Sequence, residues 1–129
     1  MADNEEIIWP VEAIPETDKL YMRVHRSYVH NGDFVPGAFR DHGGGMSTDW
    51  EKYATPIETK NRCANPNDNG VIEMVSGNVA AVPGLTVVHT PDVQRRIRAH
   101  VDVVGDKKAP EVRVKLKRIA SWVIGCQLN

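Results

Sequence analysis

Three side chains able to take part in acid–base or anion chemistry alternate along the segment 97–104. They are Arg98, His100 and Asp102. The positions between and beside them are apolar and comprise Ile97, Ala99, Val101 and Val103. Because successive side chains of a strand point to opposite faces, a strand here places a guanidinium, an imidazole and a carboxylate in a row. This segment is therefore the first place to look for a site.

Two further segments carry similar side chains. One side of the alternating segment 19–27 presents Tyr21, Arg23 and His25. His89 closes the segment 85–89. Paired imidazoles can act as general base and general acid near neutral pH, and guanidiniums stabilise a phosphate or a developing anion. If these strands are neighbours, their polar side chains collect on one face or in one cleft.

Together these residues predict a site that binds or processes a phosphate-containing ligand, such as a nucleotide or RNA. The predicted acid–base residues are His25 and His100, with a helper, His89. The predicted ligand-binding residues are Arg23, Arg98, Tyr21 and Asp102. Two alternatives remain open. The residues could form the solvent-facing side of an antiparallel sheet, and the chain could be a non-catalytic interaction module that docks a partner or a second copy of itself.

Several well-defined motifs are missing from the sequence. The histidines match neither the HExxH spacing nor a zinc motif with paired CxxC, so no metal site is predicted. The glycines 43–45 lack the Lys–Ser/Thr ending of a P-loop, and Ser47 lacks the context of a nucleophile elbow. We therefore predict no metal and no cofactor.

The segments that must position the candidate residues are mostly short strands. Alternating and apolar runs predict an extended segment at 46–50 and strands at 19–27, 71–75, 79–82, 85–89 and 97–104. Asn31 and Gly32 predict the turn of a short hairpin. A helix is predicted over 53–64, where Thr55 and Glu58 have the spacing of a capping box and a proline follows the cap.

The C-terminal segment carries two conflicting periodicities. Residues 111–117 alternate like a strand. Four apolar residues recur at helical spacing, namely Val112, Leu116, Ile119 and Val123. The longer helical stripe favours a helix that ends at Gly125. Thr90 and Pro91 similarly predict the start of a short helix.

A chain of 129 residues fits one domain. Several strands interrupted by two or three helices predict a single compact α+β domain over 19–129, with a mainly antiparallel sheet and a C-terminal helix. Residues 1–18 hold six acids, two prolines and no Lys or Arg. They predict an acidic, extended N-terminal arm.

Charge is unevenly distributed along the chain. Residues 93–129 hold nine basic and three acidic residues, which suggests an anionic partner for the C-terminal third. Two alternatives to an anionic partner remain open: the basic C-terminal third could lie against the acidic N-terminal arm, or both could be solvated surface. No apolar run approaches the roughly 20 residues that span a bilayer, and the acidic start lacks a secretory signal. A cytosolic protein without membrane association, with Cys63 and Cys126 as free thiols, is expected.

Motifs spread along nearly the whole chain resemble a family of small uncharacterised bacterial proteins. They are Ile14-Pro15, 18–24, Ala38-Phe39, 46–50, 88–91 and Ala99-His100. That family has no established function, so the resemblance implies a bacterial single domain and no activity. Arg23 followed by Ser47 and Thr48 is also similar to the opening of Arg-Ser-Glu ADP-ribosyltransferases. Their pattern continues to a catalytic Glu, often within Glu-x-Glu, a motif that Glu58 and Glu73 do not form.

Overall fold

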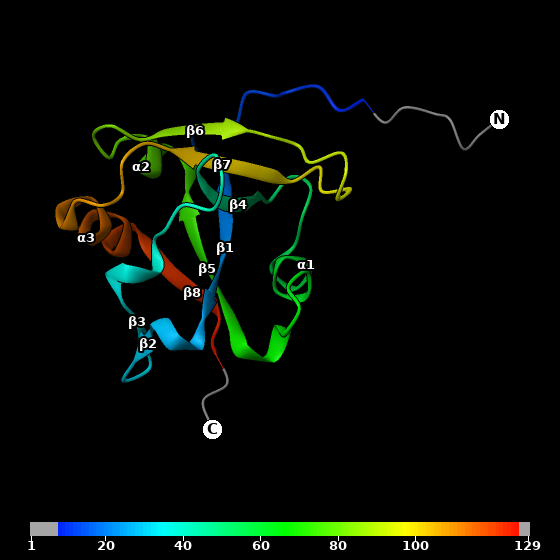
Figure 1. Ribbon diagram of the computed structural model, residues 1–129. Coiled ribbons are helices and arrows are strands. Elements are labelled where there is room, and N and C mark those ends of the chain that lie inside the picture. Colours follow the sequence, from blue (N-terminus) through cyan, green and yellow to red (C-terminus); the bar gives the residue numbers. More distant parts are fainter. Residues whose placement is uncertain (1–7, 127–129) are drawn as a thin grey trace.

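A six-stranded antiparallel sheet forms the centre of the protein in the computed structural model, which describes residues 8–126 (Figure 1). The strand order is β6-β7-β4-β1-β5-β8. The strands are β1 (Lys19–His25), β4 (Met46–Trp50), β5 (Asn69–Val75), β6 (Thr86–His89), β7 (His100–Val104) and β8 (Ala120–Ile124). A separate hairpin joins β2 (Val29–His30) to β3 (Asp33–Phe34). The predicted single α+β domain with a mainly antiparallel sheet is confirmed.

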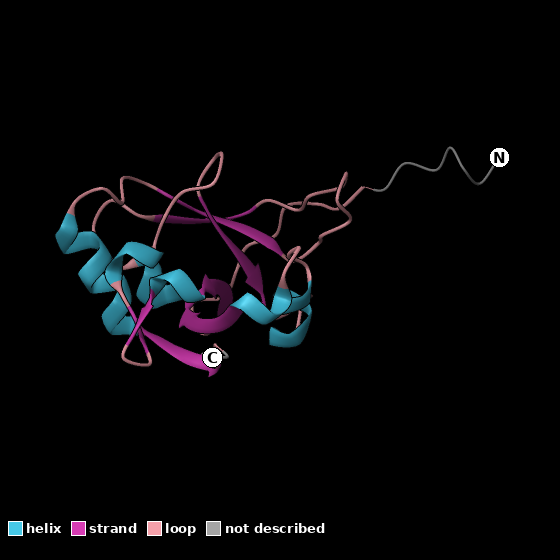
Figure 2. Cartoon of the chain, turned by 60° about the horizontal axis from the view of Figure 1, so that its bottom comes forward, coloured by secondary structure: helices cyan, strands magenta, loops and turns pink. Residues whose placement is uncertain are grey.

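Three α-helices lie against this sheet in the described part of the chain. They are α1 (Pro56–Asn61), α2 (Ser76–Ala80) and α3 (Pro110–Ile119). Single 3-10 turns occur at Arg26–Tyr28, Pro36–Ala38 and Pro66–Asp68. Figure 2 shows the helices in two groups on opposite sides of the strands. In Figure 1, α2 and α3 form one group and α1 lies in the other.

The group that contains α2 and α3 covers the apolar face of the sheet. Leu20 and Met22 of β1 form a continuous core with Val79 of α2 and Leu116 of α3. Trp50 of β4 belongs to the same core and is 1% exposed. Burying a leucine side chain contributes on the order of 2 kcal/mol. The opposite face of β1 and β4 is left for polar side chains, and α1 contacts β1 and β5 on that side.

Two local sequence patterns form as predicted. Thr55 caps α1 by accepting from the backbone N–H of Glu58, and the Glu58 carboxylate accepts from the backbone N–H of Thr55. The Asn31–Gly32 turn joins β2 to β3, with both residues at positive φ. The helix is shorter than the predicted 53–64, because Tyr53 and Ala54 belong to a turn that precedes the cap.

The C-terminal helix ends earlier than predicted. α3 stops at Ile119, and Ala120 turns extended with φ −102° and ψ 149°. The following residues form β8 and pair with the edge of β5. Trp122 then packs edge-on against Phe34 with ring centroids 5.2 Å apart, whereas Val123 is 40% exposed. The helical spacing of Val123 was therefore coincidental. The backbone after Ile119 pairs with the edge of β5 instead of continuing the helix.

Two other predicted elements are also wrong. Segment 79–82 belongs to α2 and the turn after it, because Val79 and Val82 are buried together at a spacing of three residues. Thr90 and Pro91 start no helix; the chain instead forms an isolated bridge between Asp92 and Ile97. Residues 8–18 contain no helix or strand, and the rest of the predicted arm, 1–7, lies outside the described residues.

Candidate functional site

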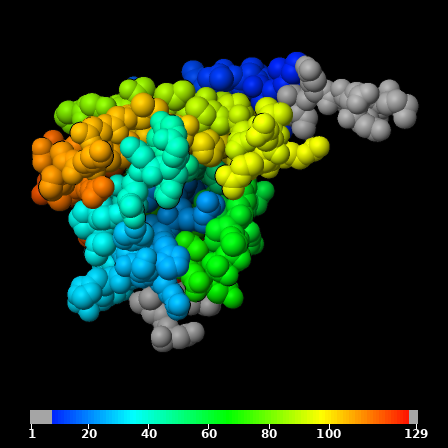
Figure 3. Space-filling view, in the orientation of Figure 1, coloured from blue at the N-terminus to red at the C-terminus, as the bar shows by residue number. Residues whose placement is uncertain are grey.

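A cavity of about 290 Å³ opens where β1 and β4 part. β1 pairs with β5 at seven positions but with β4 only at Leu20–Trp50 and Tyr21–Asp49. In Figure 1, β6 and β7 cross the top of the view, while β1 and β5 run antiparallel to each other through the centre. Figure 3 shows the surface hollowed between the loop near residue 42, the loop near residue 95 and α1. The divergence of two adjacent strands thus creates the space.

Polar and charged groups from six segments line this cavity. The ionisable lining residues are Tyr21, Arg23, His25, Tyr28, Arg40, His42, Asp49, Arg62, Arg95 and His100. Four arginines therefore face one carboxylate. With its histidines neutral, the lining carries a formal net charge of +3. An unbalanced group of guanidiniums around a concave site is a strong attractor of anions.

The sheet register places three of these residues in one row. Tyr21 of β1 pairs with Asp49 of β4, which pairs with His100 of β7. Cross-strand partners lie on the same face of a sheet, so the phenol, the carboxylate and the imidazole are neighbours. Burial is the main cause that raises the pKa of Tyr21, and the negative charges of Glu51 and Glu73 add to it. Tyr21 therefore acts as a neutral hydrogen-bonding group.

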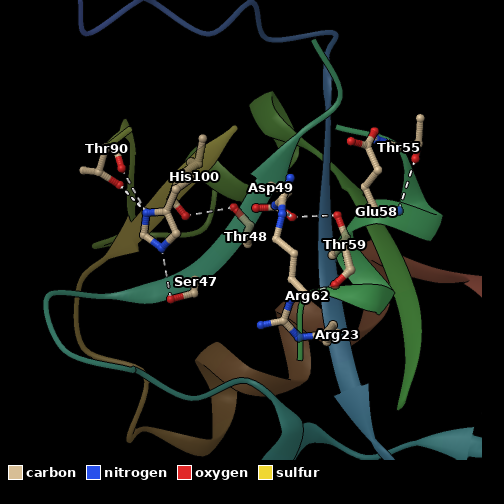
Figure 4. Close-up of polar contacts among 11 residues, drawn as sticks. Arg23, Ser47, Thr48, Asp49, Thr55, Glu58, Thr59, Arg62, Thr90 and His100 are labelled. Carbon is tan, nitrogen blue, oxygen red and sulfur yellow. Dashed lines mark hydrogen bonds and ion pairs between the residues drawn. The ribbon is translucent and has the colours of Figure 1, made fainter. Parts of the chain in front are cut away.

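Helix α1 holds Asp49 in place. The Thr59 hydroxyl donates to Asp49 Oδ2 at 2.7 Å, and the Arg62 guanidinium pairs with the same oxygen (Figure 4). Arg23 Nη1 donates to the carbonyl oxygen of Thr59 at 2.7 Å. The capping box that starts α1 therefore fixes the helix from which these contacts come. Asp49 is 5% exposed, so its charge is balanced by Arg62 rather than by solvent.

His100 has a defined tautomer. Its Nδ1 lies 3.0 Å from the carbonyl oxygen of Thr90 and 2.9 Å from the hydroxyl of the same residue. A carbonyl only accepts, so Nδ1 carries the proton and the neutral ring has a bare Nε2. Nε2 lies 3.3 Å from Ser47 Oγ, as Figure 4 shows, and 3.9 Å from Asp102 Oδ1. His100 therefore offers a base beside a serine hydroxyl.

His25 has the complementary tautomer. Its Nδ1 accepts from the backbone N–H of Ser27 at 3.1 Å, which places the proton of the neutral ring on Nε2. His25 lies at the end of β1 and caps the 3-10 turn that follows. The two predicted acid–base residues, His25 and His100, thus line one cavity, one with a donor and one with an acceptor at Nε2.

The loop after β3 contributes Arg40 and His42. The guanidinium of Arg40 lies over the Tyr28 ring, with 5.8 Å between the guanidinium carbon and the ring centroid, and donates to the phenol oxygen. The loop is closed by the backbone bond from His42 N to Gly45 O at 2.8 Å. Lys107, which is 2% exposed, pairs with Asp41 at 2.7 Å and anchors the loop.

Three of the seven predicted site residues are not among the cavity lining. They are His89, Arg98 and Asp102. Asp102 lies beside the site through its contact with His100. Arg98 precedes the paired part of β7 and turns away, so its guanidinium stacks on Tyr53 at 4.2 Å. The four predicted residues that do meet in the lining are Tyr21, Arg23, His25 and His100.

His89 lies in a second polar group, here named the Glu12 cluster, which consists of Glu12, Lys52, Tyr53, His89 and Arg98. His89 is 1% exposed; its Nδ1 accepts from the backbone N–H of Glu12 at 3.0 Å, and its Nε2 donates to the Arg98 carbonyl at 2.7 Å. The Trp50 ring packs on it at 5.2 Å. Both ring nitrogens are used, so His89 has a structural role.

Several lining residues carry no signal that was recognised in the sequence. They include Tyr28, Arg40, His42, Ser47, Asp49, Thr59, Arg62 and Arg95. Most of them lie on loops or at the end of a short helix, where no periodicity marks the direction of a side chain. For Ser47 and Asp49 a signal existed, since the alternation of the extended segment 46–50 puts both polar side chains on one face.

Comparisons with known proteins identify no relative. No family model, no curated protein and no solved structure matches the chain. Among residues 8–126, no group of three or more His, Cys, Asp or Glu is arranged to hold a metal ion. Cys63 and Cys126 are free thiols. None of the described helices is both long and apolar enough to cross a membrane.

Proposed function

We propose that the cavity binds a small molecule that carries a phosphate group. The observation that supports this most is the excess of guanidinium over carboxylate in a hollow of about 290 Å³. Arginine suits this task because its planar fork donates two parallel hydrogen bonds to phosphate oxygens. The volume is near the lower end of small-molecule sites, so it suits a mononucleotide or a sugar phosphate.

Arg23 is the central anion-binding group of the proposal. Its Nη1 donates to the Thr59 carbonyl, which orients the guanidinium without neutralising its charge. Arg62, by contrast, already pairs with Asp49. Arg95 comes from the exposed loop after β6 and adds charge at the rim. Arg23 therefore supplies an oriented charge, and Arg95 an exposed one at the rim.

The remaining lining residues suit the rest of such a ligand. Tyr21 and Tyr28 offer aromatic surface, on which the base of a nucleotide can stack. Nε2 of His25 can donate a hydrogen bond to the ligand, and Nε2 of His100 can accept one. A single nucleotide or the end of an RNA strand presents the same phosphate and base to this cavity. The bacterial origin and the cytosolic location remain predictions of the sequence.

The alternative is an interaction module without a ligand. Its surface would be an exposed apolar or charged patch. Among the described residues, the exposed apolar side chains Ile57, Val104 and Val123 come from separate elements, namely α1, β7 and β8. Ile8 and Val11 are also exposed and belong to the N-terminal segment. Within residues 8–126, the cavity favours a small molecule as the ligand over a protein partner.

Binding is tested by calorimetric titration of the full chain with pyrophosphate, AMP and a short RNA, each at low and high salt. We expect binding that weakens with salt. Arg23→Gln removes one charge-assisted contact of about 1.5–3 kcal/mol, so affinity should fall roughly ten- to a hundredfold. Arg118→Gln, on the exposed side of α3, is the matched control and should bind like the wild type.

The outcomes separate the two functions. Equal weakening by Arg23→Gln and Arg118→Gln would show that only general charge attracts the ligand, and the cavity proposal would fail. The same holds if no phosphate compound binds. A concentration-dependent dimer without phosphate binding would favour the interaction module.

A further inference from the structure

We propose that Ser47 and His100 form a nucleophile–base pair that hydrolyses a phosphate monoester held in the cavity. This inference rests on the proposed function, because it needs the phosphate group to bind there. It adds a covalent step and assigns a role to Ser47, for which the sequence offers no nucleophile motif.

The first argument is the order of the hydrogen bonds. The carbonyl of Thr90 holds the Nδ1–H of His100, which leaves Nε2 free to accept a proton from Ser47 Oγ at 3.3 Å. Nucleophile, base and a third group that orients the base are the arrangement that activates a serine. Distances slightly beyond an ideal hydrogen bond are common in such pairs before substrate binds.

The second argument is that three separate segments build the pair. Ser47 lies on β4, His100 on β7 and Thr90 just after β6. Ser47 is opposite Asp102 and Asp49 is opposite His100 in the antiparallel ladder, so serine and imidazole are diagonal neighbours on one face. Sheet geometry therefore holds the nucleophile and the base rigidly, whereas a loop would not.

The third argument is electrostatic. Transfer of a phosphoryl group develops charge on the phosphoryl oxygens and the leaving oxygen, and positioned cations stabilise it. The lining supplies four guanidiniums. Asp102 Oδ1 lies 3.9 Å from Nε2 of His100 and stabilises the imidazolium once the ring has taken the proton. The net charge of the lining suits a dianionic monoester better than a monoanionic diester.

The reaction has two balanced steps. Ser47 Oγ attacks phosphorus as its proton moves to His100 Nε2; the bond from phosphorus to the ester oxygen breaks, and the leaving alkoxide takes the proton from Nε2. A water molecule then gives a proton to Nε2 and attacks phosphorus, and the bond to Oγ breaks. Ser47 recovers the proton from Nε2, and inorganic phosphate leaves. The sum is ester plus water giving alcohol plus phosphate.

The test uses p-nitrophenyl phosphate with the full chain. Release of nitrophenol is followed over time, and acid-quenched samples are searched by mass spectrometry for one phosphoryl group on the peptide that contains Ser47. We expect Ser47→Ala to abolish both signals. His100→Gln should slow nitrophenol release roughly 10²–10⁴-fold, the usual contribution of a general base. Ser121→Ala, an exposed serine on β8, is the matched control and should leave the rate unchanged.

Failure of this inference is distinguishable from failure of the proposed function. Calorimetric binding of the Ser47→Ala variant to pyrophosphate shows whether the cavity still holds phosphate. Binding without nitrophenol release in the wild type would overturn the catalytic pair and leave the binding proposal standing. Turnover that persists in Ser47→Ala would also overturn it, since water would then be the nucleophile. Loss of binding in the wild type would overturn both proposals.

Discussion

Two regions of this sheet contain the same kinds of side chain but handle charge differently. The Glu12 cluster and the cavity each combine imidazole, guanidinium, phenol and carboxylate, and their histidines His89 and His100 lie on the neighbouring strands β6 and β7. In the Glu12 cluster the groups bind one another. In the cavity the positive groups outnumber the carboxylate, and much of their charge faces open space.

The contacts of Glu12 show how its negative charge is balanced within the first region, although the buried Nε of Arg98 has no hydrogen-bond partner. Its carboxylate pairs with Lys52 at 2.6 Å, accepts from the Tyr53 hydroxyl at 2.5 Å and lies 3.7 Å from Arg98. The backbone N–H of Glu12 donates to Nδ1 of His89. The Lys52 and Tyr53 hydrogen bonds hold the pKa of Glu12 below its ordinary value. This cluster attaches the N-terminal segment to the sheet.

The comparison teaches that residue types alone do not define a site. His89 and His100 both follow apolar positions on strands, yet one has both ring nitrogens occupied and the other keeps a basic nitrogen beside a cavity. The distinguishing property is whether charges and hydrogen-bonding atoms are matched within the protein. Mutations can test this contrast directly.

The largest expected effect is on stability, from His89→Ala. The substitution leaves a cavity beneath Trp50 and removes the partners of the Glu12 N–H and the Arg98 carbonyl, so the free energy of unfolding should fall by about 3 kcal/mol. Denaturant unfolding followed by circular dichroism measures it. Affinity for pyrophosphate, corrected for the unfolded fraction, should not change.

The matching variant for the other region is His100→Ala. Its ring is partly solvent-accessible, so we expect a loss of about 1 kcal/mol or less together with weaker ligand binding. If His89→Ala impaired binding and His100→Ala impaired only stability, the assignment of the two regions would be reversed.

Asp49→Asn tests the charge balance of the cavity. Removing its one carboxylate should strengthen pyrophosphate binding about three- to tenfold, because the anion no longer faces that negative charge. The amide can still accept from Thr59, which preserves the position of α1. The measurement is calorimetric titration, and binding weaker than that of the wild type would show that Arg62 needs its partner to be oriented.

Glu12→Gln tests the Glu12 cluster through the pH dependence of stability. Since the pKa of Glu12 is lower in the folded state, its stabilising contribution is complete above the ordinary glutamate pKa, about 4.3, and is lost as pH falls through the lowered value. The wild type should therefore lose stability on acidification more steeply than Glu12→Gln. Unfolding midpoints at several acidic pH values measure the difference, and parallel curves would contradict the prediction.

The smallest effect is expected from Thr90→Val. The hydroxyl near His100 disappears, but the backbone carbonyl of residue 90 remains and still holds Nδ1–H. Affinity and turnover should therefore stay within about threefold of the wild type, because the orienting group is retained. A larger loss in the rate of nitrophenol release would mean that the hydroxyl, rather than the carbonyl, sets the tautomer.

Sequence reasoning succeeded where a pattern is local. Alternation predicted β1 and the apolar face of β7, and the spacing of Thr55 and Glu58 predicted the start of α1. It failed at the C-terminus, where helix and strand periods overlap and the free edge of β5 decided for β8. For the candidate site, it found four residues of the lining but could not separate them from His89 and Arg98.

The amino-acid sequence by itself determined which side chains alternate, where α1 is capped and where the β2–β3 hairpin turns, because these depend on interactions between residues a few positions apart. Only the tertiary structure decided that β1 leaves β4 after Tyr21, that His100 meets Ser47, and that Glu12 reaches across to His89. These features depend on register and twist between strands that are distant in the chain. No local pattern encodes which charged side chains are paired within the protein and which face a cavity.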